Sequence, residues 1–549
     1  MSINGLLNTS RRALATQSTG IQVIGDNIAN VNTPGYSRRR AEIISTTAGS
    51  SAASQVGTGS EVLKTIRIVD NFLNQDLLGR IGDRAKAQIK SEFMTRAEAP
   101  FALDGQPGRI GYELNEFFGS LEDLAANPGD IPLRTQVIQK GTDLAATIGT
   151  TYSAISTLQR EADDRIKILT TDVNRLTGSI AQLNGEIANS EIGIQESLTL
   201  RDQRDELQRQ LSELVSFRTL EDSSGKITLY LNNGFALVAG DKSFQIETTP
   251  APSFAPVGGY PVGLDGQSLS HIVHDFGGGS HVDLTNIFRA GTGEIAGLLE
   301  LRGVQSATDT STFDANGTLV DTAARVELIT RDLLTRFNLE YLGPDETAGG
   351  THQPSSFDLD GNQPATFGLF TFNGSAAGNN FGDADADGRP ETADLDAIVA
   401  LGLITNFSGR LQFNVTSERN IAAARDLDPV AGATSFATGD ASNVEALIAI
   451  RDTALTYTGL GTVNDTTTID GMYALTVSNV GAQASRANSD LNVFSERETQ
   501  TKSLQQSYSG VNLDEEFAKL ISFQRAFQAS SKLIALSDQL SQELISLLG

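Results

Sequence analysis

The sequence predicts a multidomain α+β protein: coiled-coil helices at both termini, a helical bundle domain beside them, and β-rich domains inserted between the N- and C-terminal halves. Two stripes of apolar residues with coiled-coil spacing, one near each end of the chain, predict the terminal helices. A change from helical to alternating periodicity after Val215 predicts strands in the middle. A chain of 549 residues is also too long for one ordinary hydrophobic core.

The composition excludes several classes of partner and chemistry. A formal net charge of -26 disfavours nucleic acids and anionic membranes, because both bind clustered Lys and Arg. The chain has no Cys, so it forms no disulfide and has no thiol chemistry. Its longest apolar run, residues 397–404, is far shorter than the roughly 18 residues of a membrane span, so we expect no such span.

The first predicted helix carries a narrow apolar stripe and ends at a turn. The stripe has alternating spacings of four and three, interrupted only at two polar positions, and consists of Ile3, Leu7, Leu14, Ile21, Ile24, Ile28 and Val31. A stripe this narrow needs a partner helix. Pro34 and Gly35 predict the turn, because proline disfavours helix at the preceding residue and glycine permits positive φ.

A long helical region is predicted from about Asn71 to Val215. Its clearest part is an uninterrupted seam formed by Ile166, Leu169, Val173, Leu176, Ile180, Leu183 and Ile187. Residues 127–130 read Asn-Pro-Gly-Asp, which is typical of a turn between two helices. We therefore expect several helices to pack against one another here.

Strands are predicted after this region. Alternating apolar residues precede a dipeptide typical of hairpin turns, in the order Ile227, Leu229, Leu231 and Asn233-Gly234. Residues 343–409 are rich in Gly, Asp, Asn and Thr, which predicts a loop-rich insertion or small outer domain. Helical periodicity returns near Asn443.

A second apolar stripe marks the last helix, with Leu513, Phe517, Leu520, Phe527, Leu533, Leu540, Leu544 and Leu547. Since both terminal helices need partners, we expect them to pack together, with the remaining apolar surface facing neighbouring subunits. The predicted domains are therefore nested: residues 1–40 with 509–549 as axial core helices, 60–216 with 440–508 as a helical domain, 217–342 with 405–439 as a β-rich domain, and 343–404 as the insertion.

Both ends of the chain resemble those of flagellar axial proteins. The string NIANVNTPGYSR at residues 27–38 resembles the signature shared by rod, hook and hook-associated proteins, on Asn27, Asn30, Asn32, Pro34, Gly35 and Tyr36. Rod and hook proteins usually have Thr-Gly-Phe at that place, so the Pro-Gly-Tyr favours the hook-associated protein 1 family. The C-terminal residues 509–540 and the internal segments 114–134, 200–215 and 293–302 resemble the same family. The likeness thins between residues 343 and 440.

The resemblance implies a structural subunit rather than an enzyme, with no required cofactor. Such a subunit is exported unfolded through the type III export apparatus, with an export chaperone, and assembles outside the cell at the hook–filament junction of the flagellum. The implied partners are other copies of the chain in a ring, the hook protein and hook-associated protein 3. Hook protein and flagellin are alternatives within the same class, and the residues after Thr33 and after Ser509 argue against both.

Tyr36 and the run Arg38-Arg39-Arg40 have two interpretations. Charge runs are most often solvated, so these residues could be a turn aromatic with exposed charges. Given the flagellar resemblance, an interpretation as contacts between subunits carries equal weight. Both interpretations stay open at the level of sequence.

The strongest chemical motif lies in the insertion. Asp383, Asp385, Asp387 and Asp394 occupy positions one, three, five and twelve of a calcium-loop spacing, with Gly388 at the bend. Asp at position twelve is shorter than the usual Glu, and no helix is evident before the loop. Calcium binding and an acidic solvated turn are therefore both open.

Three of the four histidines also cluster in sequence, and the chain shows no catalytic motif. His271, His274 and His281, with Asp275 and Asp283, could bind zinc, but their spacing is loose and the glycines at 277–279 favour ordinary hairpin residues. We find no nucleophile elbow and no phosphate-binding glycine loop, so no catalytic residue is predicted. The alternative from another functional class is a calcium-dependent surface adhesin or hydrolase carried by the inserted domains.

Overall fold

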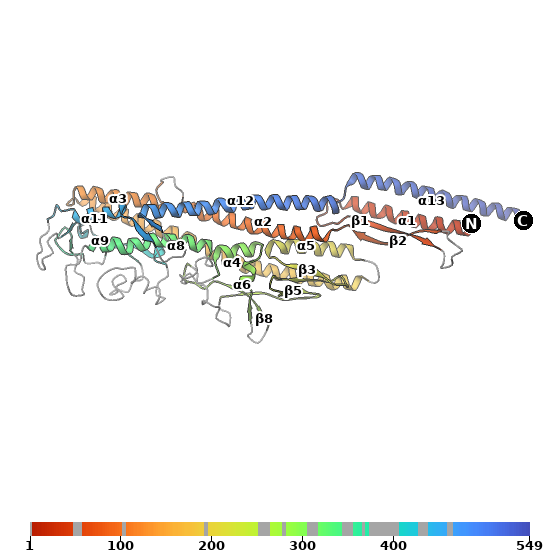
Figure 1. Cartoon of the computed structure of the whole chain (residues 1–549), viewed down its shortest axis with the longest axis horizontal. Coiled ribbons are helices and arrows are strands. Elements are labelled where there is room, and N and C mark those ends of the chain that lie inside the picture. The colour runs from red at the N-terminus through yellow and green to blue at the C-terminus, as the bar shows by residue number, and fades with distance from the viewer. Residues whose placement is uncertain are drawn as a thin grey trace.

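The computed structural model describes residues 3–47, 57–101, 106–191, 196–250, 264–276, 281–304, 317–342, 355–364, 368–372, 406–425, 437–457 and 465–548. These residues form a long, narrow molecule with both termini at the same end (Figure 1). We call the end that holds the termini the stem and the remainder the body. The α+β class with paired terminal helices is confirmed, and the sheets are small.

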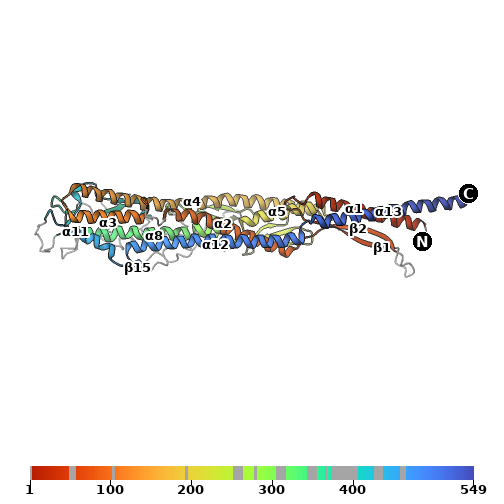
Figure 2. The same ribbon diagram turned by 90° about the horizontal axis from the view of Figure 1, so that it is seen from above.

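The stem consists of two helices and a β-hairpin. These elements are α1 (Ile3–Ala29), β1 (Arg39–Thr47), β2 (Gly57–Arg67) and α13 (Leu513–Leu548). The two helices lie side by side in both views (Figures 1 and 2), so the expected pairing of the chain ends is confirmed. The antiparallel hairpin packs on α1. It was not predicted, because its alternation is broken by bulges after Glu42 and Thr46.

Five helices run along the body: α2 (Asn71–Glu98), α3 (Ile110–Ala126), α4 (Ile131–Ser190), α5 (Leu198–Leu214) and α12 (Ile469–Ser509). Side chains cap the starts of α2, α4 and α12. Asp70 accepts hydrogen bonds from the backbone N–H groups of Phe72 and Leu73, and Thr468 caps α12 through Gly471. The predicted break at residues 127–130 separates α3 from α4, where Asp130 caps the 60-residue helix. The seam of α4 is buried except at Leu183, which is half-buried.

Two small antiparallel sheets lie beside α4 (Figure 1). The first has the order β3 (Arg218–Glu221), β4 (Ile227–Tyr230), β5 (Ala236–Ala239) and β6 (Lys242–Ser243). The second has β7 (Glu247–Thr249), β8 (His271–Asp275) and β9 (His281–Asp283). The predicted turn at Asn233-Gly234 joins β4 to β5, and Gly234 has a φ of 85°. That prediction is confirmed.

The expectation of strands up to residue 342 is wrong for residues 285–304 and 317–342. They form α6 (Thr285–Arg289), α7 (Glu294–Arg302), α8 (Thr318–Asp332), a π-helical turn (Leu333–Phe337) and α9 (Asn338–Leu342). The apolar side chains of α7 and α8 are buried against α4 and, for α7, also α2. Helix α7 is apolar almost all round, so it shows no one-sided stripe by which sequence periodicity could identify it. Helix α8 does have an apolar face, which the prediction of strands overlooked.

The far end of the body carries short elements that close the core. They are β10 (Ser356–Phe357) paired with β13 (Ala424–Arg425), β11 (Phe370–Phe372) paired with β12 (Leu411–Phe413), β14 (Leu455–Tyr457) paired with β15 (Asp465–Thr467), α11 (Ser442–Ala449), and single turns at Ala99–Phe101, Ser408–Arg410, Glu418–Asn420 and Ile450–Asp452. Buried amides attach several of them: Asn338 donates to the carbonyl of Phe370, and Asn443 donates to those of Tyr341 and Ala422. The prediction of an insertion or outer domain over residues 343–404 is therefore wrong for β10 and β11, whose phenylalanines are buried in the body.

Candidate assembly site

The contact between α1 and α13 is made largely by small and polar side chains. On α13 the contact face recurs every seven residues, at Glu516, Phe523, Ser530 and Ser537. On α1 the buried residues are Ser10, Thr16, Gly20, Val23, Ile24 and Asn27. A seven-residue repeat is the spacing of a coiled-coil seam, and small residues let the two backbones approach closely. The terminal pair is therefore close-packed at its small residues.

Gly20 is the point of closest approach in this pair. A Cβ atom placed on it would lie 2.4 Å from the Phe523 ring, which is well inside van der Waals contact. Gly25, one turn farther along α1, has open space around the same position. Only one of these two glycines is therefore required by packing.

The predicted apolar stripe of α13 lies mostly off this contact face. Leu513, Phe517, Leu533 and Leu540 are exposed, at 40%, 49%, 43% and 39% of their surface, and only Leu520 and Phe527 are half-buried. Three further apolar side chains missed by the stripe are also exposed, namely Ile521, Leu536 and Ile545. Large exposed apolar surface on one helix marks an interaction site more often than a free surface.

The stripe of α1 is more covered. Ile24 is buried, and Leu7, Leu14, Ile21, Ile28 and Val31 are half-buried between α13 and the hairpin. The side chains of Ile3, Leu544 and Leu547 lie outside the described residues. The structure thus brings together the α1 stripe and the hairpin, and leaves most of the α13 stripe uncovered.

The family motif forms a hydrogen-bonded turn around Asn27, which is buried. Its side-chain amide donates to the carbonyl of Arg39 and to Oε2 of Glu516, both at 2.9 Å. Its Oδ1 accepts from the hydroxyl of Tyr36 at 2.8 Å and from the backbone N–H of Arg39. Burial raises the pKa of Tyr36 to about 12, so this phenol stays a donor at physiological pH. A single amide thereby connects the end of α1, the turn, the hairpin and α13.

The other motif residues shape or border the turn. Asn30 donates to the carbonyl of Asp26 and accepts from Thr33. Gly35 has a φ of 78°, the left-handed conformation that favours glycine. Asn32 and Pro34 are exposed and make no contact that defines the turn.

Arg38 pairs across the chain with the start of α13. Its Nε and Nη2 atoms lie 3.0 Å and 2.7 Å from Oε1 of Glu516, and Nη2 also lies 2.9 Å from Glu515. The Glu516 side chain is almost fully buried, whereas that of Glu515 is exposed. Sequence reasoning left Arg38 open between two interpretations and missed Glu516. No local signal links residues 478 positions apart.

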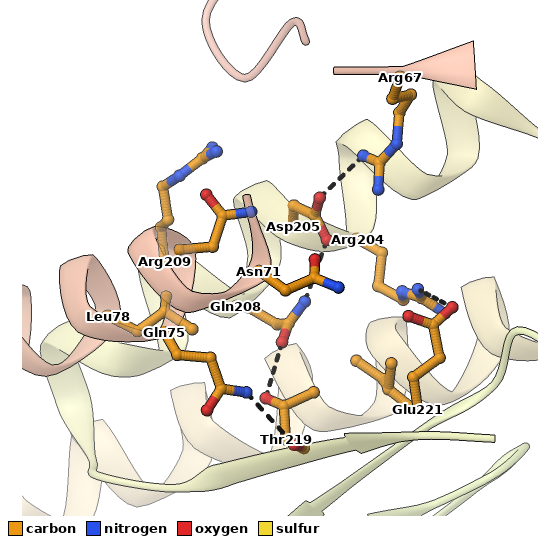
Figure 3. Close-up of a pocket in the computed structure, with 12 residues that line it drawn as sticks. Arg67, Asn71, Gln75, Leu78, Arg204, Asp205, Gln208, Arg209, Thr219 and Glu221 are labelled. Carbon is orange, nitrogen blue, oxygen red and sulfur yellow. Dashed lines mark hydrogen bonds and ion pairs between the residues drawn. The ribbon is translucent and has the colours of Figure 1, made fainter. Parts of the chain in front are cut away.

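A polar pocket of about 160 Å³ lies where the stem meets the body (Figure 3). Arg67, at the end of β2, lies 2.9 Å from Asp202 and 2.8 Å from Asp205. Below it, Gln208 donates to Asp205 and accepts from Thr219. The side chains mostly satisfy one another, so the arrangement connects β2, α2, α5 and β3 and offers no reactive group.

The candidate metal residues do not form a site in the described part of the chain. His271 pairs with Asp283 at 2.9 Å, His274 bonds the carbonyl of Gln245 at 2.6 Å, and His281 lies 3.9 Å from Asp275. Among described residues, no group of three or more possible ligands converges. The ordinary-hairpin interpretation of these histidines is the one that the geometry favours. Asp383, Asp385, Asp387 and Asp394 lie outside the described residues.

Comparisons with known proteins match both ends and the middle of the chain. The family described as the flagellar hook-associated protein FlgK helical domain matches residues 101–341. A flagellar basal body rod family matches residues 7–36, and the C-terminal family of the rod proteins FlgEFG matches residues 504–547. The flagellar hook-associated protein 1 of Bacillus subtilis is 24% identical over 99% of this chain and 98% of its own length.

The chain belongs to the flagellar hook-associated protein 1 family. The family members from Salmonella typhimurium and Escherichia coli are 23% and 22% identical, each over 99% of this chain and 100% of its own length. The structure of the flagellar hook junction protein FlgK from Burkholderia pseudomallei has the same fold, with a TM-score of 0.56 and 16% identity, over 79% of this chain and 100% of that one.

Family membership makes the chain a structural protein of the extracellular flagellum and not an enzyme. Within the described residues, no helix is both long and apolar enough to cross a membrane.

Proposed function

We propose that this chain is the adaptor that joins hook to filament, and that its stem is the part that assembles. The observation that carries the proposal is the exposed apolar stripe of α13, most of which no other described part of the chain covers. In a ring, neighbouring copies would bury this stripe, at roughly 25 cal/mol for each Å² of apolar surface. In this proposal the fifteen predicted seam residues make two kinds of contact, one inside a single stem and one between neighbouring stems.

The division of the chain follows from the same proposal. The stem forms the axial core, the helical body packs laterally, and the small sheets and the insertion point outward. The stem supports this division, because its helices and hairpin contact one another partly through polar side chains, while apolar side chains of α13 stay exposed for contact with neighbouring copies. The junction meets two different lattices, so its two axial faces are expected to differ.

The specific partners are proposed from the family resemblance. They are further copies of the chain, the hook protein on one side and hook-associated protein 3 on the other, with an export chaperone and the type III export apparatus before assembly. Family membership supports assembly with hook and filament proteins in general.

Deletion of the gene in its own bacterium tests the adaptor role. We expect hooks without filaments in electron micrographs, flagellin lost to the medium, and rescue by the full chain. Normal filaments in the deletion strain would refute the role. A chain in which a short linker replaces residues 373–405 should still rescue, because this replacement leaves the stem and the buried strands β10 and β11 in place. Failure of that variant alone would favour a binding function of the insertion.

We also propose that Asp383, Asp385, Asp387 and Asp394 bind calcium, on the spacing of their carboxylates. Titration calorimetry of the full chain should give a binding heat that Asp383→Asn with Asp385→Asn abolishes. No heat at millimolar calcium in the unaltered chain would end this proposal. Its failure would leave the adaptor role untouched.

A further inference from the structure

The joint between stem and body has no shared hydrophobic core. The core of the body extends from Ile89 to Ala487 and, among the described residues, contains none from the stem. No helix or strand of the stem packs extensively against one of the body in the described part of the chain. The chain itself crosses the joint at residues 68–70 and again at Ser509-Gly510. At the second crossing α12 ends and α13 begins at an offset (Figure 1). Parts of a chain without a large apolar interface are expected to move relative to one another.

Ion pairs with the first turns of α5 cross the joint instead. Arg67 lies 2.9 Å from Asp202 and 2.8 Å from Asp205, and both members of the first pair are about nine-tenths buried. Arg39 lies 3.6 Å from Asp202 and donates to the hydroxyl of Thr199 at 3.0 Å. Both arginines belong to the hairpin, and all of their partners here belong to one helix of the body.

A more exposed pair lies beside them. Lys64 of β2 lies 3.3 Å from Glu196, just before α5. The guanidinium of Arg39 also lies over the ring of Tyr36, 4.9 Å from its centroid, which fixes the position of this arginine. The pairs are therefore held from the stem side by a rigid turn, and from the body side by a helix.

A hollow of about 760 Å³ lies next to these pairs. It is bordered by the turn at residues 31–37 on one side and by α2, α5 and α12 on the other. Its wall carries Glu206, Arg209, Glu213, Glu498 and Lys502, a polar lining that water can fill. A rotation of the stem toward the body would therefore meet solvent before it met packed side chains.

We propose that the stem pivots on the body at Ser509-Gly510, and that the ionic clamp of Arg39 and Arg67 on Asp202 and Asp205 fixes the angle between them. The pair of Arg38 with Glu516 lies wholly within the stem, so it moves with the stem and does not resist the pivot. Buried ion pairs hold one geometry and contribute little net stability, which suits an angular stop better than a permanent interface. The clamp is a property of the single chain and does not depend on the adaptor role.

Spin-label distance measurements on the purified full chain test the clamp. The chain has no Cys, so two introduced cysteines are the only labelling positions. Gly25 in the stem and Gly178 in α4 both have open space where a side chain would start. Labels at these two positions report the angle, and a pair at Ser153 and Gly178, both within α4, is the control. The unaltered joint should give one narrow distance maximum.

Two clamp variants remove the ion pairs from opposite sides. Asp202→Asn with Asp205→Asn, and separately Arg67→Gln, should each abolish the single narrow stem–body maximum while the control distance and the helical circular dichroism are unchanged. Arg175→Gln is the matched control, because it breaks an exposed pair with Asp172 that has no part in the clamp. An unchanged stem–body distribution in both clamp variants would overturn the proposal. Loss of helical signal in both variants would also overturn it, because an angular stop is not required for folding.

Discussion

Arg302 forms a buried ion pair with Asp163 that attaches α7 and the strand region to α4, and its removal should be costly. Neither side chain has measurable exposure. Arg302 also donates to the carbonyl of Ser270 at 2.9 Å, and Asp163 accepts from the backbone N–H and the hydroxyl of the same serine at 2.9 Å and 3.0 Å. Replacement by Met fills most of the volume but removes the buried partner of Asp163, which keeps only the donors of Ser270 and the partly exposed cations Lys167 at 3.0 Å and Arg160 at 4.0 Å.

The expected loss of stability follows from removing the buried partner of the Asp163 carboxylate. Breaking one side of a buried pair costs about 3–5 kcal/mol, and Lys167 and Ser270 keep Arg302→Met near the lower end. That loss corresponds to a decrease of roughly 3–5 °C in the melting temperature of the body, measured by calorimetry, because the entropy of unfolding grows with the number of residues. Arg175→Gln, which breaks an exposed pair, should cost less than about 1 kcal/mol.

A double variant separates the ion pair from the general effect of a buried substitution. Asp163→Leu combined with Arg302→Met removes both charges, so it should recover most of the lost stability. The reasoning would be refuted if Arg302→Met were as stable as Arg175→Gln, or if the double variant lost the sum of the two single losses.

Further predictions concern the stem and the pH dependence. Glu516→Gln should speed amide exchange of α1 and α13 by an amount that corresponds to about 2–3 kcal/mol, because the nearly buried Glu516 accepts charged hydrogen bonds. The exposed Glu515 is the control: Glu515→Gln should have little effect, and equal effects would contradict the role given to Glu516. Gly20→Ala should loosen the same helices by about 1–3 kcal/mol, because its Cβ would meet a ring, whereas Gly25→Ala should protect them slightly; protection by both would contradict the packing. Burial alone would raise the pKa of Asp163, but Arg302 and Ser270 hold that pKa below its ordinary value. The carboxylate's contribution to stability is therefore complete above about pH 4 and is lost as the pH falls through the folded pKa. Asp163→Asn should flatten that part of an acid titration followed by circular dichroism, and an unchanged titration would count against this role of Asp163.

The sequence was most informative about which segments are helical and least informative about which face of each helix packs. The heptad stripe predicted α13, yet α13 meets α1 through Glu516, Ser530 and Ser537, not through Leu513 or Leu533. Apolar periodicity identifies the surface that must be covered, but it does not say by which chain. In this stem the apolar residues of α13 are largely exposed in the single copy.

Long-range polar contacts were beyond the reach of local patterns. Asn27 bonds Glu516 across 489 positions, and Arg302 pairs with Asp163 across 139. The motif around Asn27 indicated an important turn, but its contact with Glu516 depends on how the two ends pack. Helix α7 was missed because it is buried almost all round, whereas α8 has an apolar face that the sequence pattern could have revealed.

The most direct test of assembly by the stem targets the exposed stripe. Leu536 and Leu540 are exposed on α13, outside its contact with α1, so replacing both with Asn should leave the purified chain folded. Expressed in the deletion strain, this variant should give secreted chain and hooks without filaments in electron micrographs. Ile168→Asn, at an exposed apolar position of the body, should restore filaments. Normal filaments with the double α13 variant would contradict the account.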